Sequence, residues 1–254
     1  MELTGKTALI TGGAVRVGKA ITLALARAGA NVVINYFSSQ EEVVKTAHEA
    51  EALGVRALPL RADIADRAQV EQMVREVERQ LGGVDVLVNS ASPFLKTPFP
   101  VQNEADWERW KRVLDVLIYG AAYCASAVAP GMLARGQGAI VNILDLVIYE
   151  PWRDFTAHAV GKAGLLALTR QLALELAPAV RVNAVAPGAV LPPEYLSEER
   201  RTAIARRNLM GRWGNPEDVA GAVLFLARSD FITGEVLVVD GGERWNHLGK
   251  DSAV

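Results

Sequence analysis

Short runs of β-branched and other apolar residues alternate with longer amphipathic segments along this chain, and this alternation constrains the fold more than any other feature. The short runs are nearly continuous in apolar residues, as expected for parallel strands covered on both faces. In residues 67–81, apolar side chains recur at helical spacing with charges between them. The pattern predicts an α/β fold with a doubly wound parallel sheet. The predicted strands are 6–11, 31–36, 55–60, 84–89, 138–143, 180–185 and 235–240, and the predicted helices include 15–28, 41–53 and 67–81.

The chain has 254 residues without a shift in composition, a repeat or a low-complexity tract, which indicates one Rossmann-like domain over residues 1–254. We expect about seven strands, with helices on both faces of the sheet. The least regular segment, 187–212, directly follows a predicted strand. Ligands bind at the carboxyl ends of strands in open parallel sheets, so we expect a substrate lid near residues 190–212.

Bulk composition limits the partners and the location. A net charge of −2 gives no electrostatic reason to expect nucleic acid or an anionic membrane surface. The single cysteine, Cys124, excludes an intrachain disulfide and is interpreted as a small buried hydrophobe. No secretory signal is visible, and no uninterrupted apolar run approaches the roughly 20 residues of a membrane span. We therefore expect a cytoplasmic protein with a small-molecule substrate and no metal site.

A glycine-rich segment, "TGGAVRVGKA", follows the first predicted strand and opens a helix. Glycines at such a bend let the backbone approach a pyrophosphate and point helix-terminal N–H groups toward it. Gly12, Gly13 and Gly18 are suitably placed, although the spacing is not GxGxxG. The position between strand and helix predicts a dinucleotide site.

The end of the second strand bears on the choice of cofactor. In "NYFSSQ" no carboxylate is present to accept the ribose hydroxyls of NAD, and the first acid is Glu41. Ser38 and Ser39 can donate hydrogen bonds to a 2′-phosphate, and Arg16 is expected to add positive charge nearby. NADP(H) is therefore predicted over NAD(H). Asp63, past the third strand, is a candidate for the adenine amine, with a helix-capping acid as the alternative.

Several motifs in order resemble the short-chain dehydrogenase/reductase superfamily: "TGGAVRVG", "NSAS", "IVNILD", "HAVGK", "RVNAVAPG" and "VVDGG". The resemblance runs from residue 4 to about residue 242. It implies nicotinamide cofactor chemistry, with the strand ends and following turns around the nucleotide, and it implies a homotetramer. The cofactor-binding residues so implied are Thr11, Gly12, Arg16, Val17, Gly18, Tyr36, Ser38, Ser39, Asp63, Ile64, Asn89, Ser90, Ala91, Lys162, Pro187, Gly188 and Val190.

Details narrow the resemblance to the pteridine reductase branch. Arg16 stands where most relatives have glycine, and Asp145 stands at the usual serine position. "NSASPF" is similar to a segment of that branch and places Phe94 where a ring stacks on the pterin, with Ser92 beside the substrate. "APGAVLPPE" also resembles that branch. Simpler interpretations are packing for Phe94, a cap or salt bridge for Asp145, and a surface cation for Arg16.

The predicted catalytic residues are Asp145, His158 and Lys162, and His158 departs from the superfamily pattern. Residues 158 and 162 share one helix face, and the resemblance implies a tyrosine as proton donor at the first position. Lys162 keeps the implied role of binding the nicotinamide ribose. A lysine beside a histidine disfavours imidazolium, whereas Asp145 favours it. Two further departures are Leu117 in place of a water-holding asparagine, and Pro192 near a usual threonine.

The leading hypothesis is an NADPH-dependent reductase of a dihydropteridine-like substrate. The first alternative is a carbonyl or 3-oxoacyl thioester reductase, which would share the cofactor framework. The second, of another class, is a catalytically impaired NADP(H)-binding protein, which loss of the tyrosine favours. The tail "ERWNHLGKDSAV" either covers a neighbouring site or lacks order.

Overall fold

A computed structural model describes residues 1–192 and 196–248. Its centre is a seven-stranded parallel sheet with the order β3-β2-β1-β4-β5-β6-β7. This confirms the predicted fold class, and every predicted strand is present with ends that shift by at most two residues. The strands are β1 (Thr7–Thr11), β2 (Asn31–Tyr36), β3 (Ala57–Arg61), β4 (Val86–Asn89), β5 (Gly138–Ile143), β6 (Val180–Pro187) and β7 (Val236–Val239).

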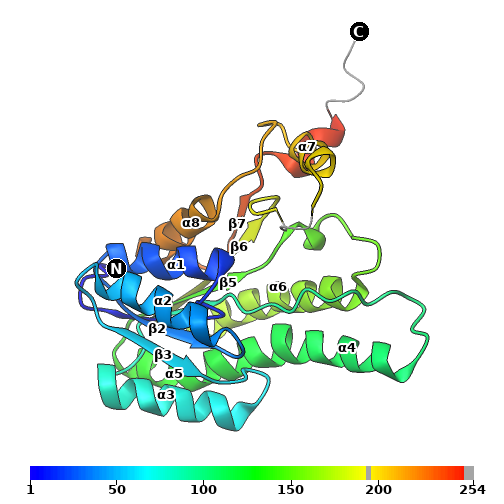
Figure 1. Ribbon diagram of the computed structural model, residues 1–254. Coiled ribbons are helices and arrows are strands. Elements are labelled where there is room, and N and C mark those ends of the chain that lie inside the picture. The colour runs from blue at the N-terminus through cyan, green and yellow to red at the C-terminus, as the bar shows by residue number, and fades with distance from the viewer. Residues whose placement is uncertain (193–195, 249–254) are drawn as a thin grey trace.

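Helices cover both faces of this sheet (Figure 1). Alternate strand residues enter opposite layers: Ile10 packs with the α1, α2 and α8 side, while Leu9 packs with the α3 and α5 side. Buried Cys124 lies in the second layer, and burial raises the pKa of its thiol to about 12, which confirms a packing role. The helices are α1 (Arg16–Arg27), α2 (Gln40–Glu51), α3 (Arg67–Leu81), α4 (Glu104–Leu114), α5 (Ala121–Ala134), α6 (Thr156–Leu176), α7 (Glu198–Ala205) and α8 (Pro216–Arg228).

The strand order reverses between β1 and β4, because the chain leaves β3 at one edge and returns beside β1. Loops after neighbouring strands diverge at such a point and leave a crevice at the carboxyl ends. The glycine-rich turn after β1 and the "NSAS" turn after β4 therefore face each other there. Thr11 joins them, since its Oγ1 accepts hydrogen bonds from the backbone N–H groups of Ser90 (3.0 Å) and Ala91 (3.1 Å).

A π-helical turn, η1 (Asp115–Gly120), joins α4 to α5 into one helical stretch. The stretch from Glu104 to Ala134 has the length and mean hydropathy (1.6) of a membrane-spanning helix, although charged residues interrupt its first part. Within the described residues it is the one such stretch. Met132 and Val128 of α5 lie fully within the core, so burial in the fold accounts for the apolar character of this part.

Candidate active site

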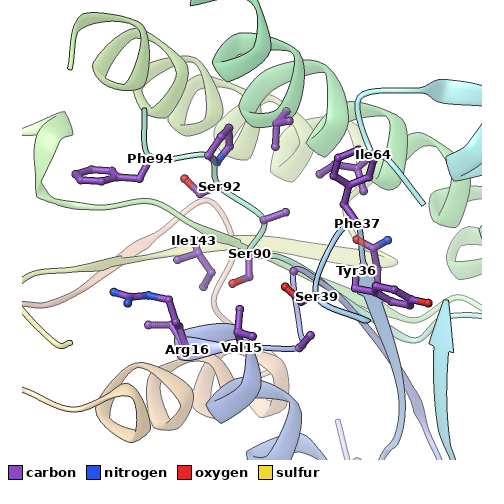
Figure 2. A pocket seen from close by; sticks show the side chains of 18 of the residues that line it. Val15, Arg16, Tyr36, Phe37, Ser39, Ile64, Ser90, Ser92, Phe94 and Ile143 are labelled. Atoms are coloured by element: carbon purple, nitrogen blue, oxygen red, sulfur yellow. The ribbon is translucent and has the colours of Figure 1, made fainter. Parts of the chain in front are cut away.

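A cavity of about 510 Å³ opens at the carboxyl ends of the strands. Figure 2 shows it between the glycine-rich turn, the loop after β2 and the turn after β4. Of the predicted cofactor residues, thirteen line it: Gly12, Arg16, Val17, Gly18, Tyr36, Ser38, Ser39, Asp63, Ile64, Ser90, Ala91, Lys162 and Pro187. The predicted substrate and catalytic residues Ser92, Phe94, Asp145 and His158 line the same cavity.

Four predicted cofactor residues lie outside this lining, namely Thr11, Asn89, Gly188 and Val190. Thr11 instead ties the two turns together, as described above. Asn89 donates from Nδ2 to Asn142 Oδ1 at 2.8 Å and so joins β4 to β5. Gly188 packs on β7, where a side chain would lie 2.9 Å from the backbone of Asp240. Val190 lines a second cavity, together with Asn208 and Asp240.

The glycine-rich turn fits a pyrophosphate. A Cβ on Gly18 would lie 2.1 Å from the carbonyl oxygen of Gly12, so no larger residue is tolerated in this bend. Helix α1 begins after Val15, which offers no side-chain cap, and its first turn holds no acid. Its first N–H groups therefore lack capping partners where residues 15–18 line the cavity. Such an N-terminus is suited to a phosphate group.

At the far end of the cavity Asp63 is engaged by Arg112 of α4. Arg112 Nη1 donates to both carboxylate oxygens, at 2.8 and 3.0 Å, and the guanidinium lies 5.3 Å from the centre of the Phe37 ring. Asp63 also accepts a hydrogen bond from the N–H of Ala65, but the cap of α3 is Asp66. The helix-cap alternative for Asp63 is therefore wrong, and its position in the cavity leaves the adenine hypothesis open.

Arg16 does not lie where the sequence analysis placed it. Its Nη2 donates to the carbonyl of Leu191, in the loop after β6, at 3.4 Å. Figure 2 shows its side chain directed toward the Phe94 side of the cavity, away from Ser39 and Tyr36. The reason is the left-handed backbone of Arg16, with φ of 52°, which turns the side chain toward the β6 loop. The expected contribution of Arg16 beside a 2′-phosphate is thus corrected.

Asp145 and His158 form a close pair at the centre of the site. His158 Nε2 lies 2.6 Å from Asp145 Oδ2, and the other carboxylate oxygen accepts the N–H of Val147. Asp145 follows β5 and caps a short turn, while His158 lies in the first turn of α6. A carboxylate bonded to imidazole requires a proton on the shared nitrogen. The simple interpretation of Asp145 as a cap is confirmed, and its hydrogen bond to His158 adds to its place in the cavity.

The two members of this pair differ in exposure. The side chain of His158 is 2% exposed and that of Asp145 is 16% exposed. Nδ1 of His158 is buried and has no hydrogen-bond partner among the described residues. Asp145 is therefore the member that reaches the open cavity, with His158 behind it.

Lys162 lies one helical turn beyond His158 and is also buried. Its Nζ donates to the carbonyl of Ile143 at 2.7 Å. Burial lowers the pKa of Lys162, and the charge of Asp145 partly opposes this. Burial alone would raise the pKa of Asp145, but the hydrogen bond from His158 and the charge of Lys162 hold it below its usual value. Asp145 is therefore ionised at neutral pH.

Aromatic rings form the outer wall of the site beside His158. Phe94 stacks on Phe155 with a centroid distance of 4.4 Å and meets His158 edge-on at 5.3 Å. Trp152 stacks parallel to the imidazole at 6.2 Å. Phe94 remains 57% exposed, so simple core packing does not describe it. Trp152 stands nearly perpendicular to Phe94 (76°) and Phe155 (88°), and of these three rings Phe94 is the one that lines the cavity.

Leu117 occupies the position at which the superfamily resemblance implies an asparagine that holds a water molecule. It is fully buried with Val113 and Ala157, and a side chain on Gly161 would lie 2.7 Å from its Cδ1. This position therefore offers no polar group for a water relay. Pro192 is partly buried at the end of the described β6 loop, and residues 193–195 of the expected lid lie outside the described residues. The lid region that follows contains α7.

Three residues of the site were not among those predicted from the sequence, namely Arg112, Trp152 and Phe155. The two aromatic residues stand in "YEPWRDF", just before α6, where a cluster of rings beside a catalytic helix is a usable signal. Arg112 carries no local signal, because it reaches the cavity only through the packing of α4 beside the loop after β3.

The parallel sheet, the glycine turn at the head of α1 and the lysine beside the cavity define a dinucleotide-binding oxidoreductase fold. The family model for enoyl-(acyl carrier protein) reductase matches residues 13–243. The chain belongs to the short-chain dehydrogenase/reductase superfamily.

Among curated relatives, 3-oxoacyl-[acyl-carrier-protein] reductase FabG of Thermotoga maritima is 38% identical over 247 residues, covering 95% of this chain and 99% of the relative. 3beta-hydroxysteroid dehydrogenase 1 of Eggerthella lenta is 36% identical, covering 95% and 94%. A solved structure of a short-chain alcohol dehydrogenase from Sinorhizobium meliloti, itself assigned without proof of activity, superimposes with a TM-score of 0.88 at 32% identity, covering 95% and 97%. The structure of acetoin dehydrogenase YohF of Salmonella typhimurium superimposes with a TM-score of 0.84 at 31% identity, covering 93% of this chain and 95% of that structure's chain.

Proposed function

We propose that this protein is an NADPH-dependent reductase in which the Asp145–His158 pair supplies the proton. The observation that carries the proposal is the 2.6 Å contact between the two side chains in the cavity that also holds Lys162. NADPH, when bound, supplies a hydride. Residues 15–18 of the glycine turn suit its pyrophosphate, and Lys162 suits a ribose hydroxyl because its ammonium has three donors and one is used by Ile143.

The proton step follows from the charges of the pair. With both imidazole nitrogens protonated, His158 and ionised Asp145 are neutral together. Loss of one proton to the substrate leaves neutral imidazole beside the carboxylate. The shared proton passes to the substrate through Asp145 Oδ2, on the more exposed side of the pair, and a proton from solvent then restores the Nε2–H that the 2.6 Å contact requires. General acid catalysis of this kind contributes roughly 10²- to 10⁴-fold to the rate.

A carbonyl group is the substrate that the comparisons favour. The relatives above are named for 3-oxoacyl, hydroxysteroid, alcohol and acetoin substrates, and each name denotes a carbonyl–alcohol pair. Carbonyl reduction leaves an alkoxide that needs a proton, and the Asp145–His158 pair can supply it in place of the tyrosine. We therefore propose a ketone or 3-oxoacyl thioester as the first substrate class.

A dihydropteridine-like ring is the second candidate, and Phe94 favours it. The exposed ring borders the cavity together with Ser92, and offset stacking on a flat heterocycle adds about 0.5–1.5 kcal/mol beyond burial. Ionised Asp145 would also accept hydrogen bonds from ring N–H groups. None of the relatives reported above is named for this substrate.

NADPH oxidation tests the two classes against each other. Acetoacetyl-CoA and small ketones form one arm, and dihydrobiopterin and dihydrofolate form the other, each from pH 5 to 8. Turnover of the first arm alone supports carbonyl reduction, and turnover of the second alone supports pteridine reduction. If neither arm exceeds background while NADPH binds, the protein is a catalytically impaired cofactor-binding protein and the proposal fails.

We also propose that the chain assembles as a homotetramer, as its superfamily resemblance implies. Apolar side chains such as Leu174 of α6 (76% exposed) and Phe231 after α8 (fully exposed) lie uncovered on the protomer. A contiguous patch of such side chains would mark a contact with a further subunit, whereas single ones are normal on a protein surface. The final residues, 249–254, whose role in covering a neighbouring site was raised by the sequence, lie outside the described residues.

A further inference from the structure

The end of the cavity opposite the Asp145–His158 pair is lined by Arg112, while Arg61, outside the lining, donates from its Nε to the carbonyl of Phe37 at 3.2 Å. Arg112 and Phe37 both line it, with Ser38 and Ser39 alongside. Phe37, Ser38 and Ser39 belong to the loop after β2, and Arg112 belongs to α4, 74 residues after Ser38 in the sequence. The side chain of Arg16 is directed toward the loop after β6, away from Ser39 and Tyr36.

Two contacts hold the Arg112 guanidinium in place without using all of its donors. Its Nη1 binds Asp63, and its face lies over Phe37 at 5.3 Å. In the part of the chain that the structure describes, its Nε and Nη2 make no hydrogen bond. A guanidinium has five N–H donors in a fixed fork, so those that remain can bind a second anion.

We propose that Arg112 is the residue that selects NADPH over NADH, by binding the 2′-phosphate of the adenosine ribose. This inference rests on the proposed NADPH dependence. Asp63 acts as a positioning residue, because its carboxylate fixes the guanidinium beside the loop after β2. Ser38 and Ser39 add neutral hydroxyl donors there. No carboxylate lies in residues 36–40 to repel a phosphate dianion.

The alternative for Arg112 is a purely structural one, in which its ion pair with Asp63 anchors α4 to the loop after β3. The two roles predict different ligand dependence. An anchoring role affects every nucleotide that enters the cavity. A phosphate-binding role affects only nucleotides that carry the 2′-phosphate.

Binding of 2′,5′-ADP and of ADP, measured by calorimetry without turnover, tests this difference. For Arg112→Ala we expect the affinity for 2′,5′-ADP to fall about 10- to 100-fold, because a charge-assisted hydrogen bond is lost. The affinity for ADP should change less than about threefold. For Arg112→Lys, which keeps the charge but loses the planar fork, the loss for 2′,5′-ADP should be intermediate.

Arg75→Ala is the matched control. Arg75 lies on α3, forms an exposed ion pair with Glu71 and is not part of the cavity. Arg75→Ala removes one positive charge, as Arg112→Ala does. Its substitution should leave both affinities unchanged. The wild-type preference for 2′,5′-ADP should also decrease between 50 and 500 mM salt more than that of Arg112→Ala, because salt screens the phosphate contact.

The outcomes separate this inference from the proposed function. If wild type binds 2′,5′-ADP and ADP equally, the NADPH preference itself is wrong and the role of Arg112 falls with it. If wild type prefers 2′,5′-ADP and Arg112→Ala keeps that preference, the proposed function survives and the assignment of Arg112 is overturned. Equal losses for both nucleotides in Arg112→Ala overturn it as well and identify an anchor.

Discussion

At the scale of single residues, the chemistry of this site depends on how His158 is held. A tyrosine at this position would act through a phenol whose ionisation a nearby lysine assists. The imidazole of His158 instead contacts the carboxylate of Asp145 at 2.6 Å, so the two side chains share one proton. The histidine at position 158 can therefore replace the tyrosine only together with Asp145, the carboxylate that follows β5.

The pH dependence of turnover follows from these charges. The pKa of Asp145 is held below its usual value, so Asp145 stays ionised from pH 5 to 9 and its own titration contributes no change there. We therefore expect this carboxylate to cause no change of rate across that range. His158→Ala should reduce kcat about 10²-fold or more with NADPH binding retained, because the hydrogen-bonded pair is lost.

Steady-state rates between pH 5 and 9, with a solvent isotope effect to show that proton transfer is limiting, check this expectation. An unchanged kcat in His158→Ala under these conditions would mean that the proton comes from another source. His158→Tyr provides the reverse control. Activity gained by that variant from an inert wild type would identify an impaired site.

The same pair has a consequence for stability. Because the folded pKa of Asp145 lies below its unfolded value of about 3.9, the pair stabilises the fold above that pH, and the stabilisation is lost as pH falls through the folded pKa. Asp145→Asn should therefore be less stable than wild type at pH 7, by about 1–3 kcal/mol. Thermal denaturation at pH 7 and pH 3 measures whether the difference narrows in acid.

At the scale of secondary structure, the turn between β1 and α1 is the element on which the cofactor site depends. Its path is fixed by close backbone approach, since the Cα of Gly18 faces the carbonyl oxygen of Gly12. The sequence identified this turn from glycine spacing and position alone. It did not identify α7, because the prolines and charges of residues 187–212 obscure a helix of only eight residues.

Gly18→Ala tests the turn. The added Cβ would lie 2.1 Å from a backbone oxygen, so the turn must open. We expect nucleotide affinity to fall at least about tenfold and stability to fall by roughly 1–3 kcal/mol, as for other overpacked sites. Gly221→Ala on α8 is the control, because it meets nothing within 4 Å and should stabilise its helix by about 0.5–1 kcal/mol. Calorimetric ADP binding and thermal melts distinguish them, and equal behaviour of the two variants would contradict the packing argument.

At the scale of the whole molecule, uncovered apolar side chains give a testable expectation for assembly. The protomer has a mass of 27.3 kDa, and light scattering should give four times that value. Leu174→Glu and Phe231→Glu place charges on the uncovered positions and should reduce the assembled fraction while leaving the fold intact by circular dichroism. A monomeric wild type would contradict the proposed tetramer.

The sequence by itself determined the α/β class, the strands, the nucleotide turn and the residues Asp145, His158 and Lys162, because these depend on local periodicity and on spacing along a strand or helix. The tertiary structure decided which side chains meet. It paired His158 with Asp145, turned Arg16 toward the β6 loop and brought Arg112 to Asp63 and Phe37. These contacts depend on the packing of segments far apart in the chain, and no local pattern encodes the distance between them.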